Sequence, residues 1–348
     1  MERRMKERSI TADVLKGLAV LFMIQVHITE VIADTSIYNS WIGKISLFLG
    51  GPPAAPVFMT VMGYFLAASS KNLQHTVLRG LKLIAGGIAL NIAINAHLLY
   101  HIATGQSTVN PLDFIFGIDI LVLAGVTTVF IGLLKKILDI NFLIPSGLAI
   151  VVLLLTPSVN SWLNGGSKTM AYFASVLGGI APWSYFPLFP WAAYPLFGYA
   201  AYLLIKSEFA EKYLTNKVSW FLIAVWAVFV SLTIEYGIET AAALRSYYHH
   251  GIEYSAWALA FTAGFAILIN EAVKHAKENA FLEYFALIGR NVTLAYVVQW
   301  VIIGNLGSGV YRSVGLRDSY IALVAVVFVT SILIMAYENR TRLRSLFI

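Results

Sequence analysis

The sequence contains no cysteine among its 348 residues and few charged residues. The lack of cysteine excludes a disulfide framework, a thiol nucleophile and a thiolate metal site. Charged residues make up 12% of the chain, whereas soluble domains carry roughly 25%. Internal repeats and low-complexity linkers are also lacking, so we predict a single transmembrane domain over residues 1–348. With 59% hydrophobic residues, the composition is typical of a polytopic integral membrane protein.

Long apolar stretches dominate the rest of the chain. Each is roughly 17–25 residues long, the length of a membrane-spanning helix, and each is too long and alternates too little for a barrel strand. We therefore predict an all-α protein of about ten transmembrane helices. The stretches lie near residues 12–33, 54–70, 78–98, 112–134, 141–157, 184–205, 218–238, 254–272, 282–303 and 319–337.

The lysines and arginines predict the orientation, because they accumulate on the cytoplasmic side of a membrane protein. With the basic segment 1–8 placed inside, all but five of the 24 fall on the inner side. The five on the outer side are Lys44, Lys168, Arg245, Arg312 and Arg317. We therefore predict that both termini are cytoplasmic. Topology also accounts for the net charge of +6, so we expect no nucleic-acid partner.

A polar pair marks the first hydrophobic stretch. Lys16 and His27 are eleven residues apart, about three helical turns and about 16 Å of rise, which places them on one face. An ionisable residue inside a membrane is costly and indicates function, and histidine suits proton transfer near neutral pH. Lys16 as a snorkelling anchor and His27 as a structural hydrogen bonder remain alternatives. Glu30, one turn further on, either orients the imidazole or lies at the outer interface.

Two further stretches carry polar groups at membrane depth. Asn91 and Asn95 share a face of the third predicted helix, as amides that bond neighbouring helices do. Asp119 is predicted within the outer half of the fourth helix, where a buried carboxylate needs a partner. His27, Asn95 and Arg245 are the candidate partners.

A proline-rich aromatic segment spans residues 182–199. Its four prolines exclude a regular helix throughout, and irregular backbone at membrane depth requires protein or a wet cavity around it. Trp191 and Tyr194 are candidates for a sugar-stacking platform, with an interfacial aromatic belt as the alternative. Glu235 and Glu239 share a face near the outer end of the seventh helix. A carboxylate there is a candidate base on the side of an acceptor substrate, or a candidate sugar ligand.

The ninth predicted helix carries Arg290 and Asn291 in its inner half. An arginine there is costly unless it snorkels or meets an anion such as a phosphate. We expect no metal site, because His249-His250 is interpreted as a loop dipeptide and no histidine pair is expected at ligand spacing within a helix.

Four stretches resemble a superfamily of transmembrane acyltransferases that includes the acyltransferase-3 and heparan-α-glucosaminide N-acetyltransferase families. The stretches are Asp13-Val14-Leu15-Lys16-Gly17 running on to His27, Pro56 to Leu66 around Gly63, Phe186-Pro187-Leu188-Phe189-Pro190-Trp191, and Gly289-Arg290-Asn291. The third is similar to the heparan branch. That branch has Asn at the His27 position and its catalytic histidine in the next outer loop, whereas the loop here, Tyr38-Asn39-Ser40-Trp41, holds none. The catalytic assignment therefore follows the acyltransferase-3 pattern.

The resemblance implies an enzyme that passes an acetyl or other acyl group from cytosolic acetyl-CoA, through the membrane, to a hydroxyl or amine of an extracytoplasmic sugar. It implies His27 as general base or transient acyl carrier. We take Glu30 and Asp119 as its catalytic partners. The groups expected to bind the CoA donor are Lys16, Arg79, Lys82, Arg290 and Asn291. The groups expected to bind the glycan or amino-sugar acceptor are Trp191, Tyr194, Glu235 and Asn95.

A secondary transporter of a small polar or anionic solute is the alternative function, since broken helices and midplane charges suit transporters too. The absence of a detectable repeat argues against it. We expect a bacterial inner membrane as the location, although an acidic organelle also fits the orientation. A homodimer is an open alternative to a monomer.

Overall fold

The computed structural model describes residues 9–163, 168–179, 181–276 and 279–346, which leaves the basic segment 1–8 outside the described residues. Within these ranges the elements are α-helices, joined by turns and two isolated β-bridges. Ten segments are long and apolar enough to cross a membrane, which confirms the predicted all-α architecture. They are α1 (Ile10–Val31), α3 with α4 (Trp41–Gly50, Ala55–Ala68), α5 (Leu73–Ile94), α8 (Ile120–Leu138), α9 (Leu143–Leu163), α11 with α12 (Leu188–Trp191, Ala193–Ile205), α14 (Asn216–Ala242), α16 (Ile252–His275), α18 (Val292–Val310) and α19 (Leu316–Leu346).

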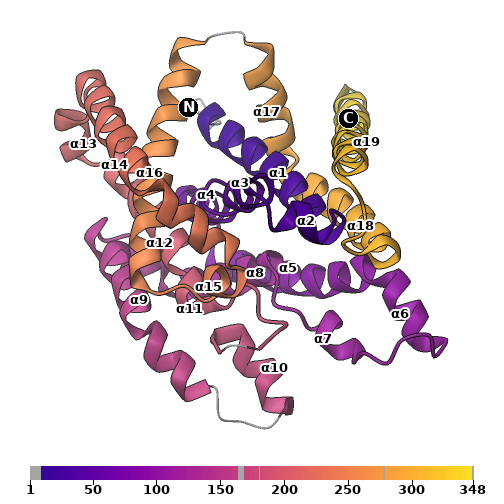
Figure 1. Ribbon diagram of the computed structural model, residues 1–348. Helices are drawn as coiled ribbons and strands as arrows, with labels where there is room; N and C mark the ends of the chain where they lie inside the picture. The colour runs from indigo at the N-terminus through magenta and orange to yellow at the C-terminus, as the bar shows by residue number, and fades with distance from the viewer. Residues whose placement is uncertain (1–8, 164–167, 180, 277–278, 347–348) are drawn as a thin grey trace.

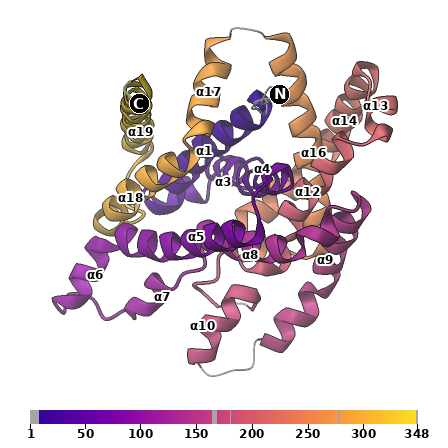
Figure 2. The same cartoon turned by 180° about the vertical axis from the view of Figure 1, so that it is seen from behind.

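Shorter helices connect these segments. They are α2 (Thr35–Tyr38), α6 (Ala96–Ala103), α7 (Pro111–Ile115), α10 (Lys168–Leu177), α13 (Glu208–Tyr213), α15 (Leu244–Tyr248) and α17 (Ala280–Arg290). Helix α1 crosses the middle of the molecule and packs against α3, α4, α17 and α18 (Figure 1). The long pair α5 and α8 runs beneath it, which is clearest from behind (Figure 2).

Several predicted spans differ from single continuous helices. The second is preceded by α3, inside the region predicted as an outer loop, and the chain turns through the buried residues Gly51–Ala54 before α4. The sixth breaks at Phe189, whose backbone is not helical, as the prolines predict. The ninth ends at Arg290 and restarts at Val292, so Arg290 and Asn291 lie at a joint between two helices and not inside one.

Glycines allow two close helix crossings, and one of them joins the first and the fourth motif stretches. A Cβ on Gly17 would collide with the backbone of Phe285, and one on Gly289 with the backbone of Asp13, so α1 and α17 touch through their main chains. In the same way a Cβ on Gly63 would collide with the backbone of Pro195, which joins α4 to α12. Small residues at such crossings let helix backbones approach closely.

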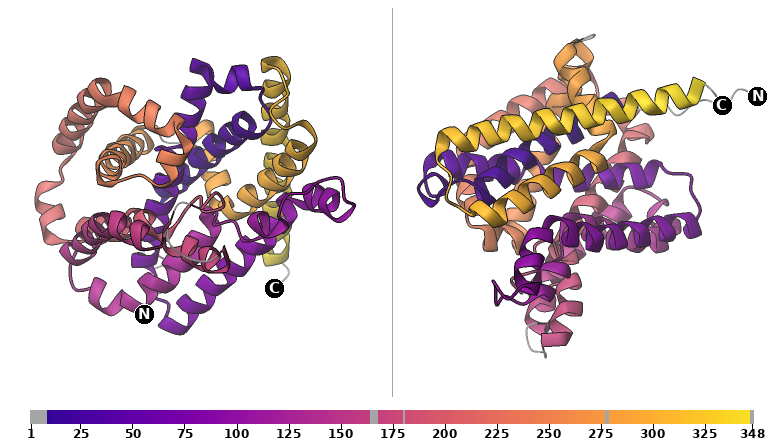
Figure 3. Two further views of the ribbon diagram at one scale, coloured as in Figure 1. Left: turned by 60° about the horizontal axis from the view of Figure 1, so that its bottom comes forward. Right: turned by 90° about the vertical axis from the view of Figure 1, so that its right-hand side faces the viewer.

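The end of α1 is fixed to the turn between α18 and α19. Ala33 and Val314 form a parallel β-bridge, and the Arg312 backbone N–H donates to Val31 O at 3.1 Å. Helix α19 therefore runs back alongside α1, so the start of α1 and the end of α19 lie at the same end of the bundle (Figure 3, right).

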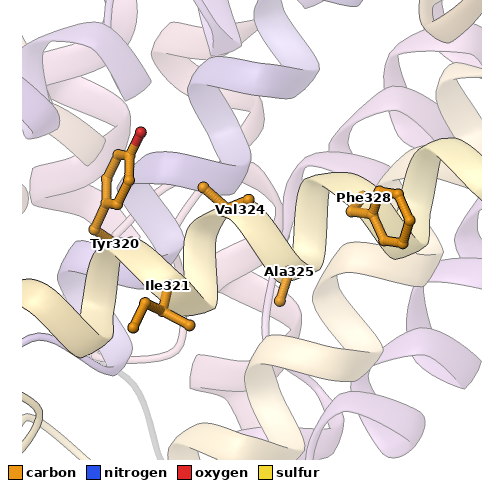
Figure 4. A pocket seen from close by; sticks show the side chains of 5 residues that line it. All are labelled: Tyr320, Ile321, Val324, Ala325 and Phe328. Carbon is orange, nitrogen blue, oxygen red and sulfur yellow. The ribbon is translucent and has the colours of Figure 1, made fainter.

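The outer face of α19 is apolar. Five of its side chains line a shallow hollow on this face: Tyr320, Ile321, Val324, Ala325 and Phe328 (Figure 4). Four of the five are apolar, which is the character of a surface that faces lipid tails. The buried polar side chains of the candidate site lie elsewhere, where α1 and α18 face each other.

Candidate active site

His27 lies near the end of α1 and is 9% exposed. Its Nδ1 is 3.0 Å from Oε1 of Gln299, and its ring stacks on the indole of Trp300 with centroids 3.7 Å apart. The amide nitrogen of Gln299 donates to Tyr296 O at 3.2 Å, which leaves its oxygen to accept from His27. In neutral His27 the proton therefore sits on Nδ1 and the lone pair on Nε2. None of the hydrogen bonds among the described residues uses this Nε2.

One face of α18 supplies these contacts. Tyr296, Gln299 and Trp300 stand at positions i, i+3 and i+4, which share a helix face. The Tyr296 hydroxyl donates to Oδ2 of Asp119 at 2.8 Å and also interacts with the side chain of Trp300. Asp119 is thus connected to the ring that stacks on His27, but it does not contact His27 through any described hydrogen bond.

The sequence predicts Asp119 inside a membrane span. The structure instead places it at the N-terminal cap of α8. Its Oδ1 accepts from the backbone N–H of Leu121 at 2.7 Å and of Val122 at 3.3 Å. A carboxylate at this position satisfies backbone donors that a helix leaves free and meets the positive end of its dipole. Among the described hydrogen bonds, none joins Asp119 to its three predicted partners, and the side chain that bonds it is Tyr296.

Two contacts hold the loop before Asp119. The Asn91 amide donates to Gly117 O at 2.8 Å and to Ile115 O at 3.1 Å. The next residue, Ile118, forms a parallel β-bridge with Ser184 in the proline-rich segment. Asn95, the predicted sugar ligand, instead donates to Asn91 O at 2.8 Å and caps the end of α5.

A group of polar and aromatic side chains lies one turn beyond His27. It comprises Glu30, Tyr38, Tyr185, Tyr248 and Arg312, and we call it the outer polar cluster after the side of the membrane that the sequence predicts for it. The Arg312 guanidinium donates to Glu30 O at 3.0 Å and lies 4.2 Å from the centre of the Tyr38 ring. The three phenols all interact electrostatically with Glu30, and Tyr248 also interacts with Tyr296. Burial raises the pKa of Tyr248 well above its usual range, so its phenol stays protonated and able to donate.

Trp191 and Tyr194 support this cluster from the interior. Both side chains are fully buried. Trp191 donates to Tyr248 O at 2.8 Å, and the Tyr194 hydroxyl donates to Nε2 of His250 at 2.9 Å. The predicted sugar platform therefore faces the protein interior. Two of the phenols that interact with Glu30, Tyr185 and Tyr248, have ring centres 5.5 Å apart.

His250 is a buried neutral base. It is 3% exposed, and its Nδ1 donates to Tyr247 O at 2.6 Å while Nε2 accepts from Tyr194. Burial lowers the pKa of His250 to about 4, because a charged imidazole would lose its hydration there.

Three predicted donor-binding residues, Lys16, Arg290 and Asn291, lie on or beside the other end of α1, but the structure does not bring the whole predicted set together. Lys16 is paired with Asp13 at 2.8 Å and lies 5.0 Å from the centre of the Phe65 ring. Arg290 is paired with Glu338 at 3.3 Å, and the Asn291 amide donates to the same carboxylate oxygen at 2.9 Å.

The remaining predicted residues are exposed on helix surfaces. Arg79 and Lys82 lie on the outward side of α5, which packs on α8. Glu235 is exposed on α14, which packs against α3, α15 and α16, so it is not brought to His27. Its neighbour Glu239 is paired with Lys44 at 2.7 Å.

Sequence reasoning missed the α18 side of the site and most of the outer polar cluster. The signal for α18 was available, since Tyr296, Gln299 and Trp300 form a polar stripe at helical spacing in an otherwise apolar helix. The cluster had no such signal. Tyr185, Tyr248 and Arg312 come from three separate connecting segments that only the fold brings to Glu30.

Comparison with known proteins identifies the family. Residues 8–236 match the family described as heparan-alpha-glucosaminide N-acetyltransferase, catalytic. Searches of curated proteins and of solved structures give no match. The matched part supplies His27, Glu30 and Asp119, whereas α18 and Arg312 lie beyond it. Since the match covers more than half of the 348 residues, the chain belongs to the heparan-alpha-glucosaminide N-acetyltransferase family of multi-pass membrane acetyltransferases.

Proposed function

We propose that this protein transfers an acetyl group from cytosolic acetyl-CoA to an amine or hydroxyl of a sugar on the opposite side of the membrane. The observation that carries the proposal is the setting of His27. Gln299 holds one ring nitrogen, Trp300 holds the ring plane, and the second nitrogen keeps its lone pair. A neutral imidazole oriented in this way is suited to act as a base or a nucleophile.

Two routes use the same nitrogen. In the direct route, Nε2 of His27 takes the proton from the acceptor as the acceptor attacks the thioester carbonyl, and the CoA thiolate leaves. In the two-step route, Nε2 attacks the carbonyl and expels the CoA thiolate, and the acceptor then displaces the imidazole from the acetyl group. Both routes end with the acetylated acceptor and CoA, with the acceptor proton passed to the thiolate.

We assign the donor side to the end of α1 that carries Lys16. The cations Lys16, Arg79, Lys82 and Arg290, together with Asn291, are the proposed contacts of the CoA phosphates. Two of these cations are already paired with carboxylates, Lys16 with Asp13 and Arg290 with Glu338. A phosphate would therefore bind Arg290 by exchange with Glu338, and Arg can hold phosphate through two parallel hydrogen bonds.

We assign the acceptor side to the outer polar cluster. It begins one helical turn beyond His27 and combines a carboxylate, three phenols and a guanidinium. Phenol rings stack on sugar faces, and carboxylate and guanidinium groups hydrogen-bond amines and hydroxyls. Glu30 and Asp119 act in this proposal as partners of the reaction, Asp119 through Tyr296. We place the protein in a bacterial inner membrane with both termini in the cytoplasm.

Labelled acetyl-CoA tests this proposal. The purified protein is incubated with the donor, with and without amino sugars, beside His27→Ala and the matched control His75→Ala, which changes an exposed histidine of α5. We expect acetyl transfer or CoA release that His27→Ala abolishes and His75→Ala preserves. Full activity in folded His27→Ala would contradict the assignment, and an absence of acetyl-CoA binding would favour a transporter. Without acceptor, an acetyl label retained on the protein identifies the two-step route.

A further inference from the structure

Two histidines of α6 form a close pair outside the site described above. His97 and His101 are one turn apart, and their Nε2 atoms are 3.1 Å from each other. Their ring centroids are 4.4 Å apart and the rings are inclined at 74°. Since the centroids are little further apart than the nitrogens, the two nitrogens meet obliquely and not head-on.

The hydrogen bonds around the pair fix where the protons are. Nδ1 of His101 contacts Oε1 of Gln106, an oxygen that only accepts. Nδ1 of His97 lies 2.6 Å from the Ser308 hydroxyl, whose own proton is donated to Asn305 O at 2.8 Å. Both imidazoles therefore donate through Nδ1. In their neutral forms they direct two lone pairs at each other through Nε2, which is unfavourable unless a positive charge lies between them.

We propose that Nε2 of His97 and Nε2 of His101 bind one divalent transition-metal ion of the zinc class. A pair of histidines at i and i+4 can hold a metal from one helix face, and neutral imidazole is a common ligand of Zn²⁺, Ni²⁺ and Cu²⁺. Gln106 and Ser308 orient the rings through Nδ1, as the outer partners of metal-binding histidines do.

The spacing of the two nitrogens suits this role. With metal–nitrogen bonds of about 2.05 Å, a separation of 3.1 Å corresponds to an angle of about 98° at the metal, between the octahedral and tetrahedral values. The described residues contain no group of three or more His, Cys, Asp or Glu that could hold a metal. The ion would therefore keep open positions for water or an external ligand. The expectation of no histidine pair at ligand spacing within a helix was wrong, because it passed over His97 and His101.

The pair also joins α6 to the end of α18. The His97 backbone N–H donates to Oδ1 of Asn305 at 3.0 Å, and the Asn305 amide donates to Ala93 O at 2.8 Å. Asn305 and Ser308 lie on the last turns of α18, just before the turn that carries Arg312 to Glu30. A metal on the histidine pair braces this end of α18.

Metal titration tests the proposal. Tag-free full-length protein is stripped with a chelator and titrated with Zn²⁺ against a chromogenic competitor, beside His97→Ala, His101→Ala and the control His75→Ala. We expect one Zn²⁺ per chain for the wild type and the control, no binding for either pair variant, and a loss of affinity of about tenfold for Gln106→Ala.

Electron paramagnetic resonance of Cu²⁺ bound to the same protein provides a second measurement. We expect hyperfine coupling to two imidazole nitrogens in the wild type, and loss of this two-nitrogen signal in either single variant. The changed side chains lie at or near the surface, and thermal unfolding checks that each variant is folded. Absence of stoichiometric Zn²⁺ binding to the wild type, or binding that survives in both His97→Ala and His101→Ala, would overturn the proposal.

Discussion

Replacing Gln299 with leucine tests how His27 is oriented. Leucine has a similar size but offers no acceptor, so the buried Nδ1–H of His27 loses its partner. A buried donor left without a partner costs about 1–3 kcal/mol. The ring is then also free to move its proton to Nε2, which removes the lone pair that the reaction needs. The change acts on the proposed base without touching either substrate.

The expected effect on the rate follows from this cost. If about 2 kcal/mol is lost in the transition state, kcat falls about 30-fold, since about 1.4 kcal/mol corresponds to a factor of ten. The KM for acetyl-CoA should stay unchanged, because Gln299 lies in the middle of α18, against His27, and not among the proposed donor contacts. A loss confined to kcat distinguishes orientation of the base from binding of the donor.

Steady-state acetyl transfer in detergent micelles or proteoliposomes measures both constants. Gln299→Glu is the matched variant, because a carboxylate still accepts from Nδ1 and should retain most of the activity. The unfolding midpoint of each variant checks that the protein is intact. Wild-type kcat in a folded Gln299→Leu variant would refute the idea that Gln299 sets the tautomer of His27.

Three further predictions concern stability and the donor. The pKa of His250 is about 4 in the folded protein against an ordinary 6.5. As the pH falls, His250 therefore binds a proton in the unfolded chain before it does so in the folded one. The neutral His250 contributes about 3 kcal/mol to the free energy of unfolding above pH 6.5, and this contribution is lost as the pH falls towards 4. Unfolding curves recorded at several pH values should show a smaller loss of stability in acid for His250→Asn. Gly63→Ala should destabilise the protein by about 1–3 kcal/mol, because the added methyl group collides with the backbone of Pro195 at the α4–α12 crossing. In the control Gly86→Ala the methyl group meets only an ordinary contact. The melting temperature should therefore fall for Gly63→Ala and not for Gly86→Ala. Lys82→Ala and Arg290→Ala should weaken acetyl-CoA affinity more than turnover, and unchanged affinity in both would place the CoA phosphates elsewhere.

The membrane helices could be predicted because each is specified by its own apolar length. The breaks within them could not be located in the same way. The joint at Asn291 joins two apolar helices, and α3 lies where the sequence predicts an outer loop. Hydrophobicity indicates that a segment lies in the membrane, but it does not indicate where the helix axis changes direction.

The candidate site was only half predictable for a similar reason. His27 and Glu30 are recognisable because a polar residue inside an apolar helix is costly. The partner of His27 is the uncharged Gln299, which lies 272 positions further along the chain. Two of the carboxylates predicted for the site, Asp119 and Glu235, form no described hydrogen bond with His27. Asp119 caps a helix, and Glu235 lies on an exposed surface. Partner choice depends on helix packing, which a single sequence does not contain.

The stack of His27 on Trp300 gives the protein an internal optical probe. Trp300 is one of eight tryptophans, and its ring lies 3.7 Å from the imidazole. The emission of an indole responds to what lies against its face, so a proton or an acetyl group arriving on His27 should alter the fluorescence of this one residue. Stopped-flow mixing with acetyl-CoA would then time the arrival and departure of the acetyl group without a label, and Trp300→Phe would remove the signal while keeping a ring beneath the histidine.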